Sequence, residues 1–307
     1  MKRSPIARAT ATALAAAAVM VVGSRVDISG DQDHHPDGAG IHWARQHQPL
    51  RQRSRRSPDL TYHGGPVMHG THVEPIFWGT SWSNPTFVGD KVSGLTDSTA
   101  GFYSGIGGSS YANTTTEYTD STASVGTAVA LGPYHTDTST VTATGQTTSA
   151  ILAEVCKEIT SPVSNGYYPV YVDRKRGKAG FCAWHSAGTC NGVSVQFAFF
   201  FNLDGDSGCD PQDNSGAHSQ GLAALANVSG HELSETLTDR QLNAWYDSSG
   251  SENADKCAWT FGTPLLTFSN NSEWKVQGNW SNAHYDASTG YPNSGGQLGC
   301  IDGGNFK

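Results

Sequence analysis

The sequence predicts a mixed α/β (α+β) fold, in which a mixed β-sheet packs on one central helix and a loop-rich C-terminal part contains short strands. Three observations predict it. Residues 167–172 and 193–202 are apolar runs rich in β-branched and aromatic residues, which is typical of strands inside a sheet. Residues 216–239 form the longest helical pattern. After Asp255 the chain returns to short strand-like pieces separated by Gly, Asn and Ser.

The first 24 residues are typical of a signal peptide. A basic start, with Lys2, Arg3 and Arg8, precedes an apolar run over 11–23, and we place the end of the signal peptide at Ser24. That run is too short to span a bilayer, which takes about 20 apolar residues. No later stretch is apolar enough to span one either. We therefore expect an exported, extracellular protein.

Residues 25–60 are expected to be a disordered linker or pro-segment. The stretch 27–59 is rich in Asp, His, Gln and Arg and has almost no aliphatic periodicity, so it cannot bury enough apolar surface to fold alone. Arginines at positions 51, 53, 55 and 56 precede Ser57 and Pro58. They fit either a processing site or a solvated basic linker. The folded part would then be a single domain, residues 61–307.

The first half of this domain is expected to contain short elements. Residues 73–79 are predicted to be a strand that ends in a glycine turn. Residues 87–103 show a helical pattern that internal glycines weaken. The Thr- and Ser-rich stretch 111–148 favours short strands and loops over helix. Residues 147–159 are predicted to be a helix with Ser149 as its N-cap.

The second half is expected to centre on the helix over 216–239, capped by Asn214 or Ser215. One side of this helix is apolar, with Leu222, Leu225, Val228, Leu233 and Leu237. Small residues allow it to approach a sheet closely: Ala223, Ala224, Ala226, Ser229 and Gly230.

The charge of the predicted domain argues against nucleic acid and membranes as partners. Residues 1–60 contain nine of the 19 Lys and Arg residues and five of the 27 acidic residues. Residues 61–307 therefore have ten basic and 22 acidic side chains and a formal charge of −12. Such a surface repels phosphate backbones and anionic lipid head groups. The chain also lacks the Gly-x-Ser-x-Gly elbow of serine hydrolases and the phosphate loop of nucleotide enzymes.

All six cysteines lie in the predicted domain, at positions 156, 182, 190, 209, 257 and 300. An even number of cysteines in an exported chain favours disulfides. A zinc cluster is the alternative, but the chain has no Cys-x-x-Cys pair. We expect Cys257 to pair with Cys300, and Cys182 to pair with Cys190.

The residues that carry chemistry lie on the central helix, in the run His231-Glu232-Leu233-Ser234-Glu235. Residues four apart on a helix differ by about 40° around its axis, so His231 and Glu235 project side by side and can bind one divalent metal ion. Glu232 points roughly 100° away from His231. This is the arrangement of the His-Glu-x-x-His zinc peptidases, the zincins, in which the Glu takes a proton from water.

Here Glu235 replaces the second histidine of that motif. A carboxylate can bind Zn²⁺, so the geometry is preserved, although another divalent metal ion could take its place. The alternative is a half-exposed polar helix face that carries an acid pair without a metal.

A third ligand would come from further along the chain. The Cα atom of Asp239 should lie about 12 Å from that of His231, too far for both to bind one ion. Glu252 and Asp255 are better candidates. One of them would bind the metal ion, and the other would hold His231 in its tautomer.

Other histidines are weaker candidates. His63, His69 and His72 flank a Gly-rich segment and could line a cleft or bind a metal ion, but a solvated loop is favoured. His185 lies between two cysteines, which could simply hold it in place.

The motif helix and three other blocks resemble the Exordium/phosphate-induced protein 1 family. The resemblance rests on residues 228–239 with 243–246, on 63–68, on 181–185 and on 252–257. Plant members of that family are apoplastic proteins linked to growth, and bacterial relatives share the helix motif. The resemblance implies secretion and a zincin-like helix, but no settled catalytic activity. The stretch 111–148 departs from the plant pattern.

Two hypotheses follow. In the first, the protein is a secreted zincin-like metallopeptidase acting on a peptide or protein substrate. Zn²⁺ binds His231, Glu235 and either Asp255 or Glu252, while Glu232 activates water and passes its proton to the leaving amine. In the second, it is a catalytically silent extracellular binding or signalling protein that keeps the metal ion for stability or lacks it. An open pocket would favour the enzyme, because structural metal sites are closed.

Overall fold

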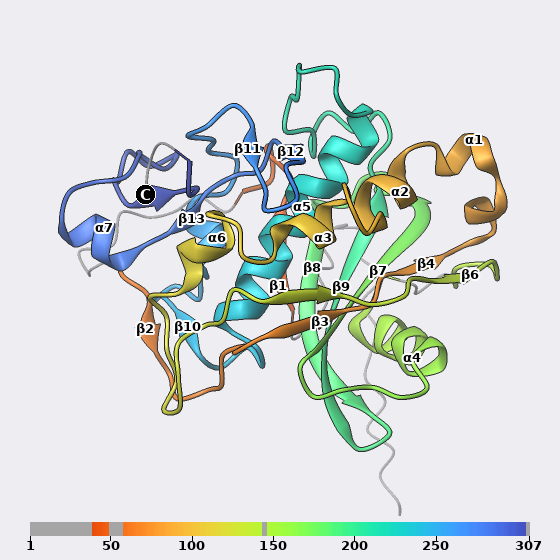
Figure 1. Ribbon diagram of the computed structural model, residues 1–307, viewed down its shortest axis with the longest axis horizontal. Coiled ribbons are helices and arrows are strands. Elements are labelled where there is room, and N and C mark those ends of the chain that lie inside the picture. Colours follow the sequence, from red (N-terminus) through yellow and green to blue (C-terminus); the bar gives the residue numbers. More distant parts are fainter. Residues whose placement is uncertain (1–38, 49–57, 143–145, 305–307) are drawn as a thin grey trace, which may run out of the picture. The chain divides into compact units, whose positions relative to one another are not determined.

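A mixed sheet of eight strands lies beside a central helix (Figure 1). This computed structural model describes residues 39–48, 58–142 and 146–304, all of them within the unit Gln32–Lys307. The predicted signal peptide and the arginine cluster at 51–56 lie outside the described residues. The predicted α/β class with a mixed sheet packed on a central helix is confirmed.

Three ten-residue strands form the middle of the sheet: β7 (Gly166–Lys175), β8 (Phe181–Cys190) and β9 (Val193–Asn202). β8 and β9 are an antiparallel hairpin, and β7 pairs in parallel with β9. The hairpin turn is Asn191-Gly192, with φ values of 52° and 79°. Asn-Gly adopts this left-handed conformation readily in two-residue hairpin loops. The strands predicted at 167–172 and 193–202 are therefore present, whereas β8 was not predicted.

Short strands extend the sheet beyond β7. They are β3 (Thr71–Val73), β4 (Ile76–Trp78), β5 (Val129–Leu131) and β6 (His135–Asp137). β3 and β4 both pair in parallel with β7. They replace the single strand predicted over 73–79, because Pro75 lies between them and has no N–H to donate to a ladder.

The opposite edge of the sheet is β1 (Gly40–Trp43), which pairs antiparallel with β8. Here the structure corrects the expectation for part of the segment 25–60. Residues 40–43 are ordered in a strand, and Ala44 has 0% relative exposure. This short stretch has too little apolar surface to fold alone, but the edge of β8 supplies hydrogen-bond partners that no sequence pattern shows.

The central helix is α5 (Gln220–Thr238), and every residue from Gly221 to Thr238 is buried. Its N-cap is Ser219, whose hydroxyl accepts a hydrogen bond from the backbone N–H of Leu222 at 3.1 Å. The helix therefore begins four residues later than predicted, and neither Asn214 nor Ser215 is the cap. The reason is tertiary, because Asp90 binds both the backbone N–H and the hydroxyl of Ser219, at 2.9 and 2.6 Å.

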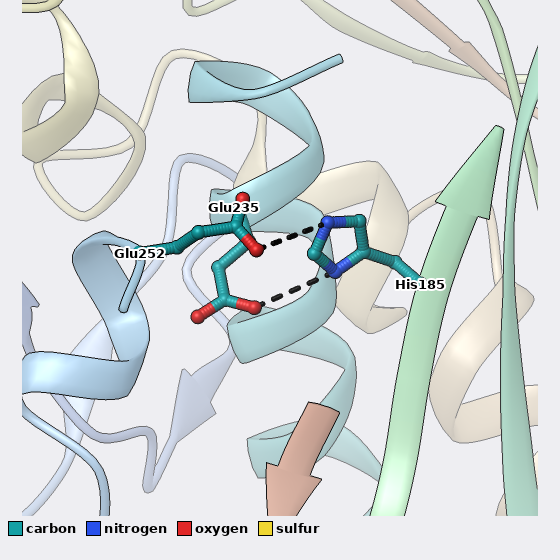
Figure 2. A group of neighbouring side chains, drawn as sticks. All are labelled: His185, Glu235 and Glu252. Atoms are coloured by element: carbon teal, nitrogen blue, oxygen red, sulfur yellow. Dashed lines mark ion pairs between the residues drawn. The ribbon is translucent and has the colours of Figure 1, made fainter. Parts of the chain in front are cut away.

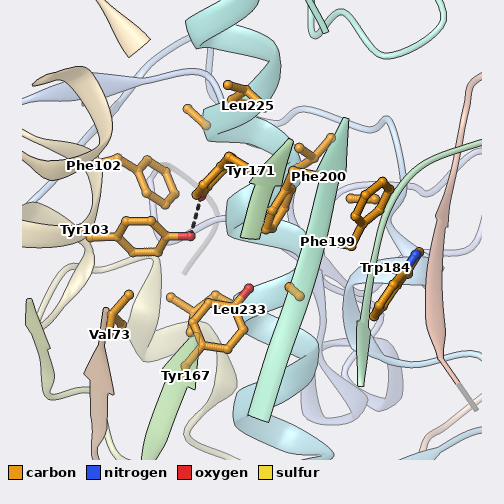
Figure 3. Close-up of a cluster of buried hydrophobic side chains, with 14 of the residues drawn as sticks. Val73, Phe102, Tyr103, Tyr167, Tyr171, Trp184, Phe199, Phe200, Leu225 and Leu233 are labelled. Carbon is orange, nitrogen blue, oxygen red and sulfur yellow. Dashed lines mark hydrogen bonds between the residues drawn. The ribbon is translucent and has the colours of Figure 1, made fainter. Parts of the chain in front are cut away.

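The core fills the space between α5 and the sheet and continues on the opposite face of the sheet, where Trp184 lies (Figure 3). Aromatic side chains fill most of it, among them Tyr103, Tyr171 and Phe200. The hydroxyl groups of Tyr103 and Tyr171 lie 2.7 Å apart, and that of Tyr171 lies 2.7 Å from Oγ of Ser229 on α5. These buried hydroxyls satisfy one another, which fixes the position of the helix against the sheet.

Helix α4 (Thr148–Glu158) covers the other face of the sheet (Figure 1). A Cβ atom on Gly188 of β8 would meet the Leu152 side chain of α4, whereas His185, of the opposite parity, faces α5. The predicted helix is therefore present, but its N-cap is Thr147, which accepts from the backbone N–H of Ala150. Ser149 is already inside the helix.

The helical pattern over 87–103 corresponds to three short helices: α1 (Pro85–Val88), α2 (Lys91–Thr96) and α3 (Phe102–Ile106). Gly89, with a φ of 51°, ends the first. The Asp97 carboxylate accepts from the backbone N–H groups of Thr99 and Ala100, which forms a turn before the third.

The C-terminal part is loop-rich with short strands, as predicted. It contains α6 (Asn253–Lys256), β11 (Leu266–Thr267), β12 (Glu273–Trp274), β13 (Asn279–Trp280), α7 (Asn282–Asp286) and β14 (Cys300–Ile301). β2 (Thr61–Tyr62) pairs with β10 (Trp245–Tyr246), and the 3₁₀ helices are η1 (Thr80–Ser83) and η2 (Ala112–Thr115). No helix among the described residues has the length and apolar character needed to cross a membrane.

All six cysteines are paired, as predicted. The Cys257–Cys300 bridge is confirmed, and it ties the end of α6 to β14. The predicted Cys182–Cys190 pair is wrong: Cys182 binds Cys209, and Cys190 binds Cys156. Cys182 and Cys190 lie near opposite ends of β8, and at about 3.3 Å per residue an extended strand separates them far beyond the reach of a disulfide.

Candidate metal centre

Helix α5 brings together the three residues of the predicted motif. His231, Glu232 and Glu235 each have 0% relative exposure. Nε2 of His231 lies 3.1 Å from Oε1 of Glu235, one helical turn later. One carboxylate oxygen of Glu232 lies within 4.8 Å of a ligand atom of each of the other two. This burial excludes the alternative of a half-exposed polar helix face.

Helix α6 supplies the two other predicted carboxylates and places them differently. Oδ1 of Asp255 lies 3.8 Å from Nε2 of His231, and the backbone N–H of Asp255 donates to Oε1 of Glu235 at 2.9 Å. Oε2 of Glu252 lies instead 3.5 Å from Nε2 of His185. Glu252 and Asp255 form the capping box of α6, which fixes the two side chains relative to each other.

His185 on β8 belongs to the same cluster. It is not among the ligands predicted from the sequence, because two flanking cysteines could simply hold it in place. The two flanking cysteines hold the strand, but the imidazole points at the acids (Figure 2). Its Nδ1 atom lies 3.1 Å from Oε2 of Glu232 and 3.4 Å from Oε2 of Glu235. Its Nε2 atom faces Glu252. His185 therefore connects the acids of α5 to the acid of α6.

His42 on β1 contacts the other nitrogen of the motif histidine. Nδ1 of His42 lies 2.6 Å from Nδ1 of His231, and Nε2 of Gln277 lies 2.9 Å from the same atom. If His231 donates from Nδ1 to His42, its Nε2 lone pair is available to a metal ion. If Gln277 donates to that Nδ1, the neutral ring carries its hydrogen on Nε2, which then has no lone pair for a metal ion. Thus His42 and Gln277, not Glu252 or Asp255, contact the atom that sets the tautomer.

The buried carboxylates have different proton affinities. Burial raises the pKa of Glu232 well above its ordinary value, and the hydrogen bond from His185 only partly offsets this. Burial also raises the pKa of Glu252, and the negative charge of Glu235 adds to the effect. For Glu235 burial acts in the same direction, but His231, His185 and the hydrogen bond from the backbone N–H of Asp255 together outweigh it and lower the pKa.

The two added histidines also differ. Burial alone would lower the pKa of His185, but the neighbouring carboxylates outweigh it and raise the pKa. Burial lowers the pKa of His42 well below its ordinary value, and the facing His231 adds to the effect. His42 is therefore a neutral imidazole near neutral pH.

Several buried polar atoms of the cluster have no hydrogen-bond partner among the described residues. They are Nε2 of His42, His185 and His231, and one carboxylate oxygen each of Glu232, Glu235 and Glu252. A buried polar atom without a partner costs about 1–3 kcal/mol, so native proteins seldom gather several in one place. A bound cation would satisfy an imidazole nitrogen of His185 or His231 and neighbouring carboxylate oxygens together, whereas His42 belongs to neither potential metal-binding group of this cluster.

The spacing of these atoms also fits a metal ion. Glu235 is shared by two groups whose ligand atoms all lie within 4.8 Å of one another, one with His231 and Glu232, the other with His185 and Glu252. Ligand atoms lie about 2 Å from a zinc ion and therefore about 3–4 Å apart. Small side-chain movements close the difference, so the residues present fit a divalent cation with nitrogen and oxygen ligands.

The centre is closed. His185 and Glu252 have relative exposures of 1% and 4%, and β1 lies against them. Only the side chain of Asp255, at 20%, reaches toward the surface.

The histidines at the start of the domain lie elsewhere. Nε2 of His69 lies 3.0 Å from Asp120, and Nε2 of His72 lies 2.7 Å from Glu74, in partly exposed ion pairs. No potential metal-binding group among the described residues includes His63, His69 or His72.

Comparison of the chain with family models, with curated proteins and with solved structures gave no match. The resemblance to the Exordium family therefore stays a prediction.

Proposed function

We propose that this protein is a secreted zinc-dependent metallopeptidase of zincin-like architecture that hydrolyses peptide bonds. The observation that carries the proposal is the cluster of buried polar atoms between α5, α6 and β8 that have no hydrogen-bond partner in the described part of the chain. It contains the side-chain types that zinc prefers, and it includes a spare carboxylate for acid–base work.

In this proposal His231, Glu235 and Asp255 hold the metal ion. Support comes from the 3.1 Å and 3.8 Å distances from Nε2 of His231 to the two carboxylates. When bound, zinc would supply Lewis acidity that polarises a peptide carbonyl and lowers the pKa of water. Glu252, the fourth predicted ligand, belongs to the other potential metal-binding group, with His185 and Glu235. It would therefore bind an ion held by that group and not one held by His231 and Asp255.

Glu232 would be the general base. His185 holds its Oε2 atom at 3.1 Å, which leaves Oε1 to accept a proton and return it to the leaving amine. Oε1 is buried and has no hydrogen-bond partner within residues 39–48, 58–142 and 146–304, so none of these residues competes for that proton.

Secretion is part of the proposal. Three disulfides are typical of proteins that fold in an oxidising compartment. Membership of the Exordium family would agree with this destination.

The second candidate is a catalytically silent extracellular binding or signalling protein. Closure of the centre favours it, because a structural metal site has no open coordination position.

Metal analysis of purified protein, with two matched variants, tests the proposed ligands. The expected result is about one zinc ion per chain. Asp255→Asn should weaken zinc binding by about 10-fold or more, because it removes a ligand charge, whereas Glu252→Gln should weaken it less. Chelator competition measures both affinities.

The opposite order of the two effects would move the ion to His185, Glu235 and Glu252. A wild-type chain that binds no divalent metal ion would remove the enzyme proposal altogether. A zinc-loaded chain without peptidase activity would favour the silent protein, provided that the centre is accessible to substrate in the assay.

A further inference from the structure

We infer that the outer edge of β8, with the side chains of His185, His231 and Glu252, is a peptide-binding surface whose occupant is this chain's own segment 39–48. When the segment is in place it closes the centre, and its withdrawal opens it. The inference rests on the proposed function, since it describes how that site is covered. Its geometric part can be tested without any catalysis.

The segment binds as a strand. Gly40, Ile41 and His42 pair with His185, Trp184 and Ala183 of β8 in antiparallel register. β1 is the last strand of the sheet on that side and pairs only with β8 among the described strands. Removing it would leave the hairpin of β8 and β9 intact and expose a row of unpaired N–H and C=O groups, which is the surface that extended peptides recognise.

Gly40 lies directly on the centre. A Cβ atom at this position would be 2.1 Å from Cε1 of His185 and 2.6 Å from Oε2 of Glu252. No side chain fits there without moving one of these two residues. The backbone of β1 therefore occupies the space through which a substrate would have to approach His185 and Glu252 from the edge of the sheet.

The ring of His42 packs against the ring of His231. It has 0% relative exposure, and its ring centroid lies 3.8 Å from that of His231 and 4.6 Å from that of Trp259. Trp259 has a φ of 60°, which is rare for a bulky residue. The imidazole of His42 is thus held between a candidate metal ligand and a tryptophan.

Contacts at the C-terminal end of the segment anchor it. Nε1 of Trp259 donates to the backbone carbonyl of Trp43 at 2.8 Å. The guanidinium of Arg45 donates twice to the carbonyl of Asp210, at 3.1 and 2.8 Å, and lies 4.6 Å from the Trp259 ring centroid. These contacts hold the segment without a covalent bond to the surface it covers.

The covalent tether to residue 58 keeps the segment in place. Residues 49–57 lie outside the described residues, but their sequence joins the segment to the domain, which makes binding intramolecular. Short tethers of this kind give an effective concentration in the millimolar range. Cutting the tether would make the contact bimolecular, and a short segment then dissociates on dilution unless its own affinity is high.

The first experiment cuts the tether in the full chain. The recognition sequence of a site-specific protease replaces residues 50–56, and the cut and uncut proteins are compared at nanomolar concentration. We expect the N-terminal fragment to separate on gel filtration, and amide hydrogen exchange over 181–185 to rise about 10-fold or more at alternate residues, while β9 stays protected.

The second experiment returns the segment as a synthetic peptide of residues 39–48. We expect the wild-type peptide to restore the protection of β8. Gly40→Ala and His42→Ala peptides should bind about 10-fold more weakly or worse, because one adds a clashing Cβ atom and the other removes the buried ring. A Gln46→Ala peptide is the matched control, because Gln46 is exposed, and it should bind like wild type.

The outcomes separate the two proposals. If the fragment leaves and β8 loses protection but no peptide is hydrolysed, the binding surface stands and the peptidase proposal falls. If the cut fragment stays bound at nanomolar concentration until the protein unfolds, or if Gly40→Ala binds like wild type, the inference is overturned whatever the activity.

Discussion

Glu232 and Glu235 are three positions apart on α5, yet their surroundings shift their pKa values in opposite directions. Burial dominates at Glu232 and raises its pKa, whereas the neighbouring histidines and a backbone hydrogen bond together outweigh burial at Glu235 and lower its pKa. A carboxylate with a raised pKa is a stronger base than an ordinary one, and a carboxylate that stays ionised suits a ligand of a cation. The two residues therefore suit the different roles proposed for them.

The role of Glu232 predicts the effect of Glu232→Gln. This change keeps the size of the side chain and removes the base, so turnover of a peptide library should fall about 10²-fold or more. Zinc content and thermal stability should barely change, because Glu232 is not a proposed ligand. His231→Ala is the contrasting variant, and it should lose both zinc and activity. Full-rate cleavage by Glu232→Gln would place the chemistry elsewhere on the chain.

A buried ion pair beside α6 predicts a pH dependence of stability. Burial alone would raise the pKa of Asp247, but the ammonium of Lys256, 2.9 Å away, and the hydrogen bonds from Ser249 outweigh it and lower the pKa. A lowered folded pKa means that the stabilisation is present above the unfolded pKa of about 3.9 and is lost as the pH falls through the folded value.

Urea unfolding of wild type and Asp247→Asn checks this expectation. The variant should be less stable by about 3 kcal/mol near pH 7, and the difference should shrink below about pH 4. A difference that stays constant down to pH 2 would show that the charge of Asp247 is not what stabilises the pair.

The first residue of α5 depends on a tertiary contact as well as on the local sequence. Ser215 and Ser219 are both acceptable N-cap residues, but only Ser219 receives the hydrogen bond from Leu222. Ser219→Ala should therefore cost about 1 kcal/mol of stability, the usual value of a cap. Ser215→Ala, the matched control, should change stability by less than about 0.5 kcal/mol. Equal effects in thermal unfolding would contradict this assignment of the cap.

The β8–β9 hairpin shows a signal that sequence reasoning overlooked. Asn-Gly between two runs of strand-forming residues is the strongest short-range sign of a hairpin. Recognising it would have predicted β8 and, from the period of two along a strand, would have placed His185 on the face opposite to Trp184. Which of those faces meets α5 could not have been read from the same pattern, because it depends on packing between distant segments.

At the scale of the whole molecule, the disulfides have different relations to the centre. Cys257–Cys300 holds the end of α6, which has Glu252 as its N-cap and Asp255 in its first turn. Cys156–Cys190 joins α4 to the far end of β8. Replacing both members of either pair with serine should cost about 3 kcal/mol. Only loss of Cys257–Cys300 should also weaken zinc binding, as chelator competition would show.

A similar loss of zinc affinity in the Cys156–Cys190 variant would mean that general destabilisation, not the position of α6, controls the site. Thiol titration of the denatured wild-type protein is the accompanying control. It should find no free thiol.

The features of this protein that depend on neighbours along the chain could be predicted without the structure. The spacing of His231 and Glu235 placed them one turn apart as soon as the helix was recognised, since helical geometry is local. Apolar runs identified β7 and β9 for the same reason. Glu252 and Asp255 follow the helix closely enough in sequence to be proposed as further ligands.

Which distant residues complete the centre depends instead on tertiary contacts. His42 meets His231 across 189 positions, and His185 reaches the acids across a strand pairing that no periodicity specifies. The same holds for β1, whose residues are too polar to fold alone and become a strand only against β8. Burial turned a common helix motif into a cluster of unsatisfied polar atoms, because the desolvation that gives those atoms their properties comes from segments far away in the chain.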